Sequence, residues 1–148
     1  MKLCSACLLG IRCRYDGKIL GTKEEVLELL KKEILIPVCP EQLGGLPTPR
    51  EAAETTGDGN DVLKGREKVI IKNCQDITFN FIRGAEEVLR IVQLLGIREA
   101  IMKQKSPSCG CDKIPDGTFS GKIVKGDGVT TALLRKNGIK IISEEELY

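Results

Sequence analysis

The sequence predicts an α/β fold: a single domain over residues 1–148, with a mainly parallel β-sheet flanked by helices in a Rossmann-like, three-layer arrangement. Short apolar runs alternate along the chain with longer stretches of helical periodicity. That alternation is typical of parallel strands joined by crossover helices. With 148 residues, 41% of them hydrophobic, the chain is long enough to bury the core of one such domain.

Four strands and three helices are expected to form the sheet and the layers that cover it. The strands are short apolar runs at residues 2–8, 34–38, 98–103 and 139–142. The helices carry apolar residues at helical spacing, at residues 23–33, from 76–78 to about 95, and 128–137. The run at 34–38 is continuous, which is typical of a strand buried on both faces.

Local signals mark the helix ends and the segments between them. Thr22 and Glu25 match a capping box for the first helix. Asp76 or Thr78 is placed to cap the second helix, whose buried face is assigned to Phe79 and to the aliphatic residues that follow. The region between is expected to contain a short helical stretch from 50–51, a polar turn at 55–61, and a hairpin of 62–63 with 69–71.

Two glycine-rich segments come before the third helix. Residues 116–121 are predicted to form a turn or small hairpin, and Gly126 and Gly128 come directly before the helix. Such glycines can hold an anion at a helix N-terminus. Because no Walker Gly-Lys-Ser/Thr sequence follows, an ordinary helix entrance is the preferred interpretation.

Composition argues against several classes of protein. Net charge is +2 and aromatic residues make up 3%, which argues against nucleic-acid binding by charge or base stacking. No apolar run reaches the ~20 residues that span a bilayer, and no signal-peptide core follows Met1, so a cytoplasmic protein without membrane contact is expected. The sequence contains no histidine, which removes imidazole bases and His-containing zinc sites.

Seven cysteines are many for a protein of a reducing compartment, and the odd number argues against a disulfide framework. Cys7, Cys39 and Cys109 each follow a predicted strand. Because ligands of open α/β sheets bind beyond the carboxyl ends of the strands, these three thiols are expected to meet at one edge. Cys4 is expected in the core, and the isolated Cys74 is expected to be structural.

Three thiolates from three loops can close on one metal or cluster. Zinc sites with an open position usually carry histidine, so a 4Fe-4S cluster with one iron free of protein thiolate is the favoured interpretation. Cys13 and Cys111 are nearby in sequence, and either could add a fourth thiolate that fills the open position. Glu41 and Ser106 accompany two of the three cysteines and are expected in the same pocket.

The loop 105–111 has the sequence Lys-Ser-Pro-Ser-Cys-Gly-Cys and follows an apolar run. Pro107 fixes its own φ, and Gly110 lets the backbone pass close to whatever Cys109 binds. A loop this stiff and this rich in sulfur suits a metal or cluster. The alternative is a tight loop with two idle thiols.

Four motifs, taken in order, resemble the 2-thiouracil desulfurase family, which was long classed as a domain of unknown function. They are Ser5–Gly10 with Arg14–Gly17, Pro37–Glu41 with Gly44–Arg50, Ser106–Gly110, and Asp116–Gly121. The similarity runs from about residue 5 to 144. The resemblance implies a 4Fe-4S cluster held by Cys7, Cys39 and Cys109, with catalytic roles at Glu41 and Ser106.

The function expected from the resemblance is iron–sulfur-dependent removal of sulfur from a small thiolated pyrimidine such as 2-thiouracil. We hypothesise a non-redox hydrolysis in which the thiocarbonyl sulfur binds the open iron and Glu41 activates a water as general base. Ser106 would position the ring or the water, or relay a proton. Ser108, Arg50 and Arg14 are expected to bind substrate, with a structural ion pair as the alternative for each arginine.

Three other functions remain open. The same chemistry can act on thiouridine in tRNA, which the charge and the scarcity of aromatics disfavour. A fully ligated cluster would instead make an electron-transfer or sensing protein, with four essential cysteines. Purified protein that holds zinc and no acid-labile sulfide would indicate a zinc-stabilised binding module.

Overall fold

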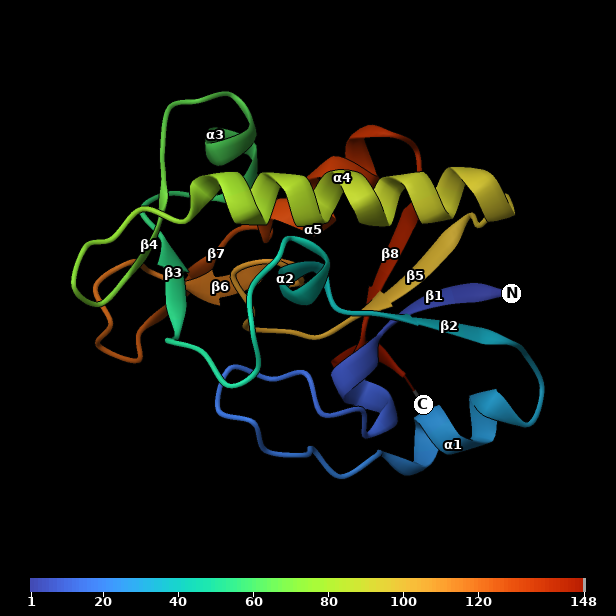
Figure 1. The fold of residues 1–148 in the computed structure, drawn as a ribbon. Helices are drawn as coiled ribbons and strands as arrows, with labels where there is room; N and C mark the ends of the chain where they lie inside the picture. The colour runs from blue at the N-terminus through green and yellow to red at the C-terminus, as the bar shows by residue number, and fades with distance from the viewer. Residues whose placement is uncertain (148) are drawn as a thin grey trace.

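The computed structural model describes residues 1–147. Its centre is a four-stranded sheet in the order β2-β1-β5-β8, and every neighbouring pair of strands is parallel (Figure 1). The strands are β1 (Lys2–Ser5), β2 (Leu35–Val38), β5 (Glu99–Met102) and β8 (Lys140–Ser143). The predicted α/β class and its parallel sheet are therefore confirmed, and the carboxyl ends of the four strands share one edge.

Helices cover both faces of this sheet. Figure 1 shows α4 (Thr78–Leu95) and α5 (Val129–Lys136) over one face and α1 (Glu24–Leu30) on the other. The side chains of each strand alternate between the two layers, as strand geometry requires. Leu3 of β1 packs with residues of α4, whereas its neighbour Cys4 packs with Val26 of α1. None of the helices in residues 1–147 is long and apolar enough to cross a bilayer.

Smaller elements extend the domain beyond the sheet. Two antiparallel pairs form small sheets, and these are β3 (Ala53–Thr55) with β4 (Val69–Ile71), and β6 (Lys113–Pro115) with β7 (Ile123–Lys125). Short helices directly follow β1, β2, β3 and β8 in the chain, and these are η1 (Ala6–Leu9), α2 (Pro40–Leu43), α3 (Gly59–Leu63) and η2 (Glu144–Glu146), respectively. The β6–β7 hairpin confirms the turn predicted at residues 116–121.

Several predicted boundaries are wrong. The first strand ends at Ser5, and the chain then turns into η1, so Cys7 lies in a 3-10 turn and not at the end of a long strand. The run at 34–38 was expected to be buried on both faces, yet β2 is an edge strand of the sheet. Pro37 is exposed there, as is typical of proline on an edge.

Residues 50–71 and the helix starts also differ from expectation. Helix α1 begins after Lys23 without a side-chain cap, so the Thr22–Glu25 capping box is not formed. In place of a helix near residue 50 the chain forms β3, which pairs with β4, and residues 62–63 belong to α3 and not to a hairpin. Phe79 points outward with 73% of its surface exposed, because Phe81 is the aromatic residue of α4 that faces the core.

Candidate functional site

A cavity of about 350 Å³ opens at the carboxyl ends of β1, β2 and β5. The chain that follows each of these strands supplies part of its wall. All eight residues predicted for the site line this cavity, and they are Cys7, Arg14, Cys39, Glu41, Arg50, Ser106, Ser108 and Cys109. The rule that ligands of parallel sheets bind beyond the strand ends therefore located the cavity correctly.

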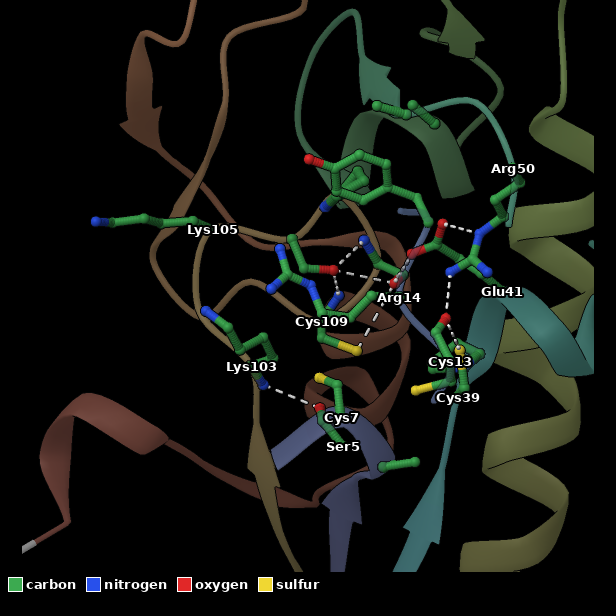
Figure 2. A pocket seen from close by; sticks show the side chains of 18 of the residues that line it. Ser5, Cys7, Cys13, Arg14, Cys39, Glu41, Arg50, Lys103, Lys105 and Cys109 are labelled. Atoms are coloured by element: carbon green, nitrogen blue, oxygen red, sulfur yellow. Dashed lines mark hydrogen bonds and ion pairs between the residues drawn. The ribbon is translucent and has the colours of Figure 1, made fainter. Parts of the chain in front are cut away.

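Four thiols gather at one end of the cavity (Figure 2). Cys7 comes from η1, Cys39 precedes α2, and Cys109 lies in the loop after β5. Cys13 joins them from the loop after η1 and is almost completely buried. The Cys39 thiol donates to the Cys13 carbonyl oxygen at a sulfur–oxygen distance of 3.7 Å, which ties the first two thiol-bearing loops together.

Burial and contacts between thiols raise the pKa values of Cys13, Cys39 and Cys109, so these three thiols are protonated in the absence of a metal. Burial raises the pKa of Cys109 to about 12, although hydrogen bonds from Ser5 and Ser108 oppose the shift. The contact with Cys13, followed by burial, raises the pKa of Cys39. The pKa of Cys13 rises to about 11: its contact with Cys39 lowers the value, but the contact with Cys7 and burial outweigh it. A metal or cluster bound here must therefore displace protons from its ligands.

The four thiols lie near one another but do not converge on one point. Within residues 1–147, no three thiol or carboxylate groups are arranged to hold a single metal ion. Thiolates of an iron–sulfur cluster bind different irons, so they stand around the cluster and not at a shared centre. A set of donors consisting of three or four thiols without imidazole also suits iron–sulfur chemistry. The residues present fit a cluster better than a single ion.

A buried ion pair forms the part of the cavity wall beside the Cys109 loop. Arg50 Nε donates to Glu41 Oε1 at 3.1 Å, and the two side chains are only 6% and 13% exposed. The guanidinium also donates to the carbonyl oxygens of Pro47 and Cys13 and to the Thr48 hydroxyl. Because Arg50 already makes four hydrogen bonds within the chain, the ion-pair alternative for this residue is observed.

The two serines of the loop have different partners. Ser108 Oγ donates to Glu41 Oε2 at 3.1 Å and lies 3.7 Å from Cys109 Sγ. Ser106 Oγ lies 3.2 Å from Ser108 Oγ and accepts the backbone N–H groups of Ser108 and Cys109. The hydroxyls thus form a chain from Ser106 through Ser108 to the Glu41 carboxylate.

Of the two remaining candidates, Arg14 reaches the cavity and Cys111 does not. Arg14 lines the cavity, where its guanidinium stacks on Tyr15 and lies 3.7 Å from Asp16 Oδ2. Cys111 does not line the cavity. It is buried in the core beside α5, where burial raises its pKa and Arg135 Nη2 donates to its sulfur at 2.8 Å. Of the two alternative fourth ligands, only Cys13 is therefore near the other thiols.

The other two cysteines lie outside the cavity. Cys4 is fully buried between β1 and α1, as predicted. Cys74 lies exposed in the turn after β4 and not in the core.

Sequence reasoning missed several polar residues of the cavity wall, among them Ser5, Lys103 and Glu54. Ser5 is buried at the end of β1, where its hydroxyl accepts the Lys103 backbone N–H at 2.9 Å. The Lys103 ammonium pairs with the buried carboxylate of Glu144 at 3.0 Å. Glu54 of β3 accepts two backbone N–H groups from the turn 116–121. Ser5 directly follows the apolar residues Leu3 and Cys4 at the carboxyl end of β1, and this position was the signal that could have identified it.

Comparisons with known proteins agree with this geometry. A model of the 2-thiouracil desulfurase family matches residues 3–146. The uncharacterized protein YbbK of Bacillus subtilis (strain 168) is 43% identical over 148 residues, which cover 99% of this chain and 97% of YbbK. A solved structure of the 4Fe-4S-dependent thiouracil desulfidase TudS superposes with a TM-score of 0.88 at 43% identity, covering 99% of this chain and 91% of TudS. The chain belongs to the 2-thiouracil desulfurase family.

Proposed function

We propose that this protein is a 4Fe-4S-dependent thiouracil desulfidase that acts on a small thiolated pyrimidine. The observation that carries the proposal is one cavity lined by Cys7, Cys39 and Cys109 together with Glu41. The similarity to TudS over the whole chain supports the cofactor and the class of substrate. The net reaction is hydrolysis: a thiocarbonyl and water give a carbonyl and hydrogen sulfide, with no change in electron count.

Cys7, Cys39 and Cys109 would hold the cluster. They come from the ends of three neighbouring parallel strands, so the sheet fixes the spacing of their loops. When bound, the cluster supplies an iron without a protein thiolate, a Lewis acid that binds sulfur and draws electron density from the thiocarbonyl carbon. Cys13 is the thiol next to this set, and we assign it no iron.

Glu41 is the candidate general base. Each of its oxygens already accepts one hydrogen bond, from Arg50 and from Ser108, which fixes the plane of the carboxylate. Each oxygen keeps a second lone pair that can take a proton from water. The hydroxyls of Ser108 and Ser106 continue from this carboxylate and offer a path for the proton to the leaving sulfur.

Sulfide release tests the activity. Anaerobically reconstituted protein is expected to release one sulfide for each 2-thiouracil converted to uracil, without consuming a reductant. A single turnover with isotopically labelled water should place the label in the uracil carbonyl. Protein that carries an intact cluster and still releases no sulfide from 2-thiouracil would refute the proposal.

Cysteine variants test the ligand set. Iron and acid-labile sulfide are measured in anaerobic Cys7→Ser, Cys39→Ser, Cys109→Ser, Cys13→Ser and Cys111→Ser proteins. We expect the first three to lose the cluster and the last two to retain four irons per chain. Loss in Cys13→Ser as well would indicate a fourth ligand and favour an electron-transfer or sensing role.

A further inference from the structure

The N-terminus of α5 is docked against the loop that carries Cys109. Gly128 and Val129 donate their backbone N–H groups to the carbonyl oxygens of Gly110 and Pro107, at 2.8 and 3.0 Å. The N–H groups of Thr130 and Thr131 both donate to the Ser108 carbonyl oxygen, at 2.9 and 3.2 Å. The N–H groups that a helix cannot satisfy internally are thus taken up by a single loop.

The Thr131 hydroxyl completes this contact. It donates to the Cys109 carbonyl oxygen at 2.8 Å and is fully buried. The Ser106 carbonyl accepts the Gly110 N–H at 2.8 Å within the loop itself. Every carbonyl group from Ser106 to Gly110 therefore has a donor, and the Cys109 carbonyl depends on a side chain for its own.

The neighbouring residue provides a natural contrast. Thr130 is as deeply buried as Thr131, but within the described chain its hydroxyl has no hydrogen-bond partner. The two threonines are adjacent in one helix and have the same side chain. They differ in one respect: the Thr131 hydroxyl is hydrogen-bonded to the carbonyl of the candidate ligand Cys109, and the Thr130 hydroxyl is not.

We infer that Thr131 is a positioning residue for Cys109, and that the first turn of α5 is the fixed support of this ligand. The inference rests on the proposed function, because it assigns Cys109 to the cluster. Removing the Thr131 hydroxyl leaves the Cys109 carbonyl buried without a donor. The peptide between Cys109 and Gly110 is then held only by the hydrogen bond from the Gly110 N–H to the Ser106 carbonyl, so it can tilt and move the thiol relative to Cys7 and Cys39.

Cluster retention tests the inference. Wild-type, Thr131→Val and Thr130→Val proteins are reconstituted, and loss of the cluster to an iron chelator is followed anaerobically by visible absorbance. We expect loss to be roughly tenfold faster in Thr131→Val, the effect of one unsatisfied buried acceptor. Thr130→Val, which removes a hydroxyl without a partner, should match the wild type, and Thr131→Ser should restore slow loss.

A second readout does not need the cluster. In metal-free protein, alkylation of Cys109 by iodoacetamide is quantified by peptide mapping, with the exposed Cys74 as an internal reference. Thr131→Val should increase the rate at Cys109 and leave the rate at Cys74 unchanged. Val26→Ala, a core truncation in α1 on the other face of the sheet, controls for lower stability alone.

The outcomes separate this inference from the proposed function. The inference is wrong if two rates in Thr131→Val, cluster loss and alkylation of Cys109, are no higher than in Thr130→Val or Val26→Ala. Thr131 would then not be a positioning residue. If the wild type binds no cluster, the proposed function fails. In that case the alkylation rates still decide whether Thr131 fixes the position of Cys109.

Discussion

Arg50 donates to Glu41 across 3.1 Å in an ion pair that is almost completely buried at the cavity wall. A second nitrogen of the same guanidinium donates to the Cys13 carbonyl oxygen at 2.8 Å. Arg50 therefore connects the candidate base to the loop that carries a cavity thiol. A planar guanidinium can make these bonds at once, whereas an ammonium on a flexible stem cannot.

Arg50→Lys should lower kcat roughly 10- to 100-fold with little change in KM, because a misoriented Glu41 weakens catalysis more than binding. Steady-state sulfide release over a range of substrate concentrations gives both constants. Arg14→Lys is the matched comparison, since Arg14 also lines the cavity but makes no contact with Glu41. A rise in KM with unchanged kcat in Arg50→Lys would instead assign Arg50 to substrate binding.

Ser108 and Ser106 should have different roles: Ser108 in catalysis, and Ser106 in holding the loop conformation as well. Ser108→Ala removes the hydroxyl that donates to Glu41, so kcat should fall while the iron content stays at the wild-type value. Ser106→Ala also removes the acceptor of two backbone N–H groups, so it should lower the thermal midpoint as well as kcat. Iron analysis, thermal unfolding and kinetics on both variants check this. Equal thermal midpoints would show that Ser106 does not organise the loop.

The location of the site could be predicted because it follows from the topology of the sheet. Cys7, Cys39 and Cys109 each come after an apolar run, and parallel strands deliver such positions to one edge. The partners of individual side chains could not be predicted in this way. Ser106 and Ser108 are two residues apart in the same motif, and only the loop conformation decides that Ser108 contacts Glu41.

The misassigned elements share a physical cause. Strand β3 has three residues, and its pairing with β4 depends on a partner about fifteen residues away, so no local pattern identifies it. Phe79 and Phe81 are both apolar and close to the start of α4, and packing decides which of them faces the core. Gly128 was predicted to lie at the start of a helix and does so. Its contact with the Cys109 loop could not be predicted, because it depends on how α5 packs against that loop.

Gly128 should tolerate no side chain. A Cβ atom at this position would lie 2.5 Å from the Ser108 carbonyl carbon and 2.6 Å from its oxygen, both backbone atoms that cannot move aside easily. Gly128→Ala should therefore lower the free energy of unfolding by about 1–3 kcal/mol and speed cluster loss. Gly21→Ala is the control, since a Cβ there has no neighbour within 4 Å. Equal unfolding free energies of the two variants in urea would contradict the close approach of α5 and the loop.

Cys4 should make the protein sensitive to alkali. Burial raises the pKa of this thiol from its ordinary value of about 9 to about 12. As the pH rises, the thiol ionises at a lower pH in the unfolded chain than in the folded protein. The stabilisation that comes from burying the neutral thiol is therefore complete below pH 9 and is lost as the pH rises toward 12. Each pH unit in this window lowers the free energy of unfolding by about 1.4 kcal/mol.

Comparison of the wild type with Cys4→Ala isolates this contribution. Urea unfolding of metal-free protein at pH 8 and pH 10 gives the free energy of each, and the other thiols are common to both. At pH 8 the variant should be the less stable, because it leaves a cavity beside Val26. At pH 10 the difference in unfolding free energy between wild type and variant should be smaller by about 1.4 kcal/mol, because only the wild type has the Cys4 thiol to ionise on unfolding. An equal difference in unfolding free energy at pH 8 and pH 10 would mean that Cys4 ionises as easily in the folded protein as in the unfolded chain. The complete burial of Cys4 argues against that result.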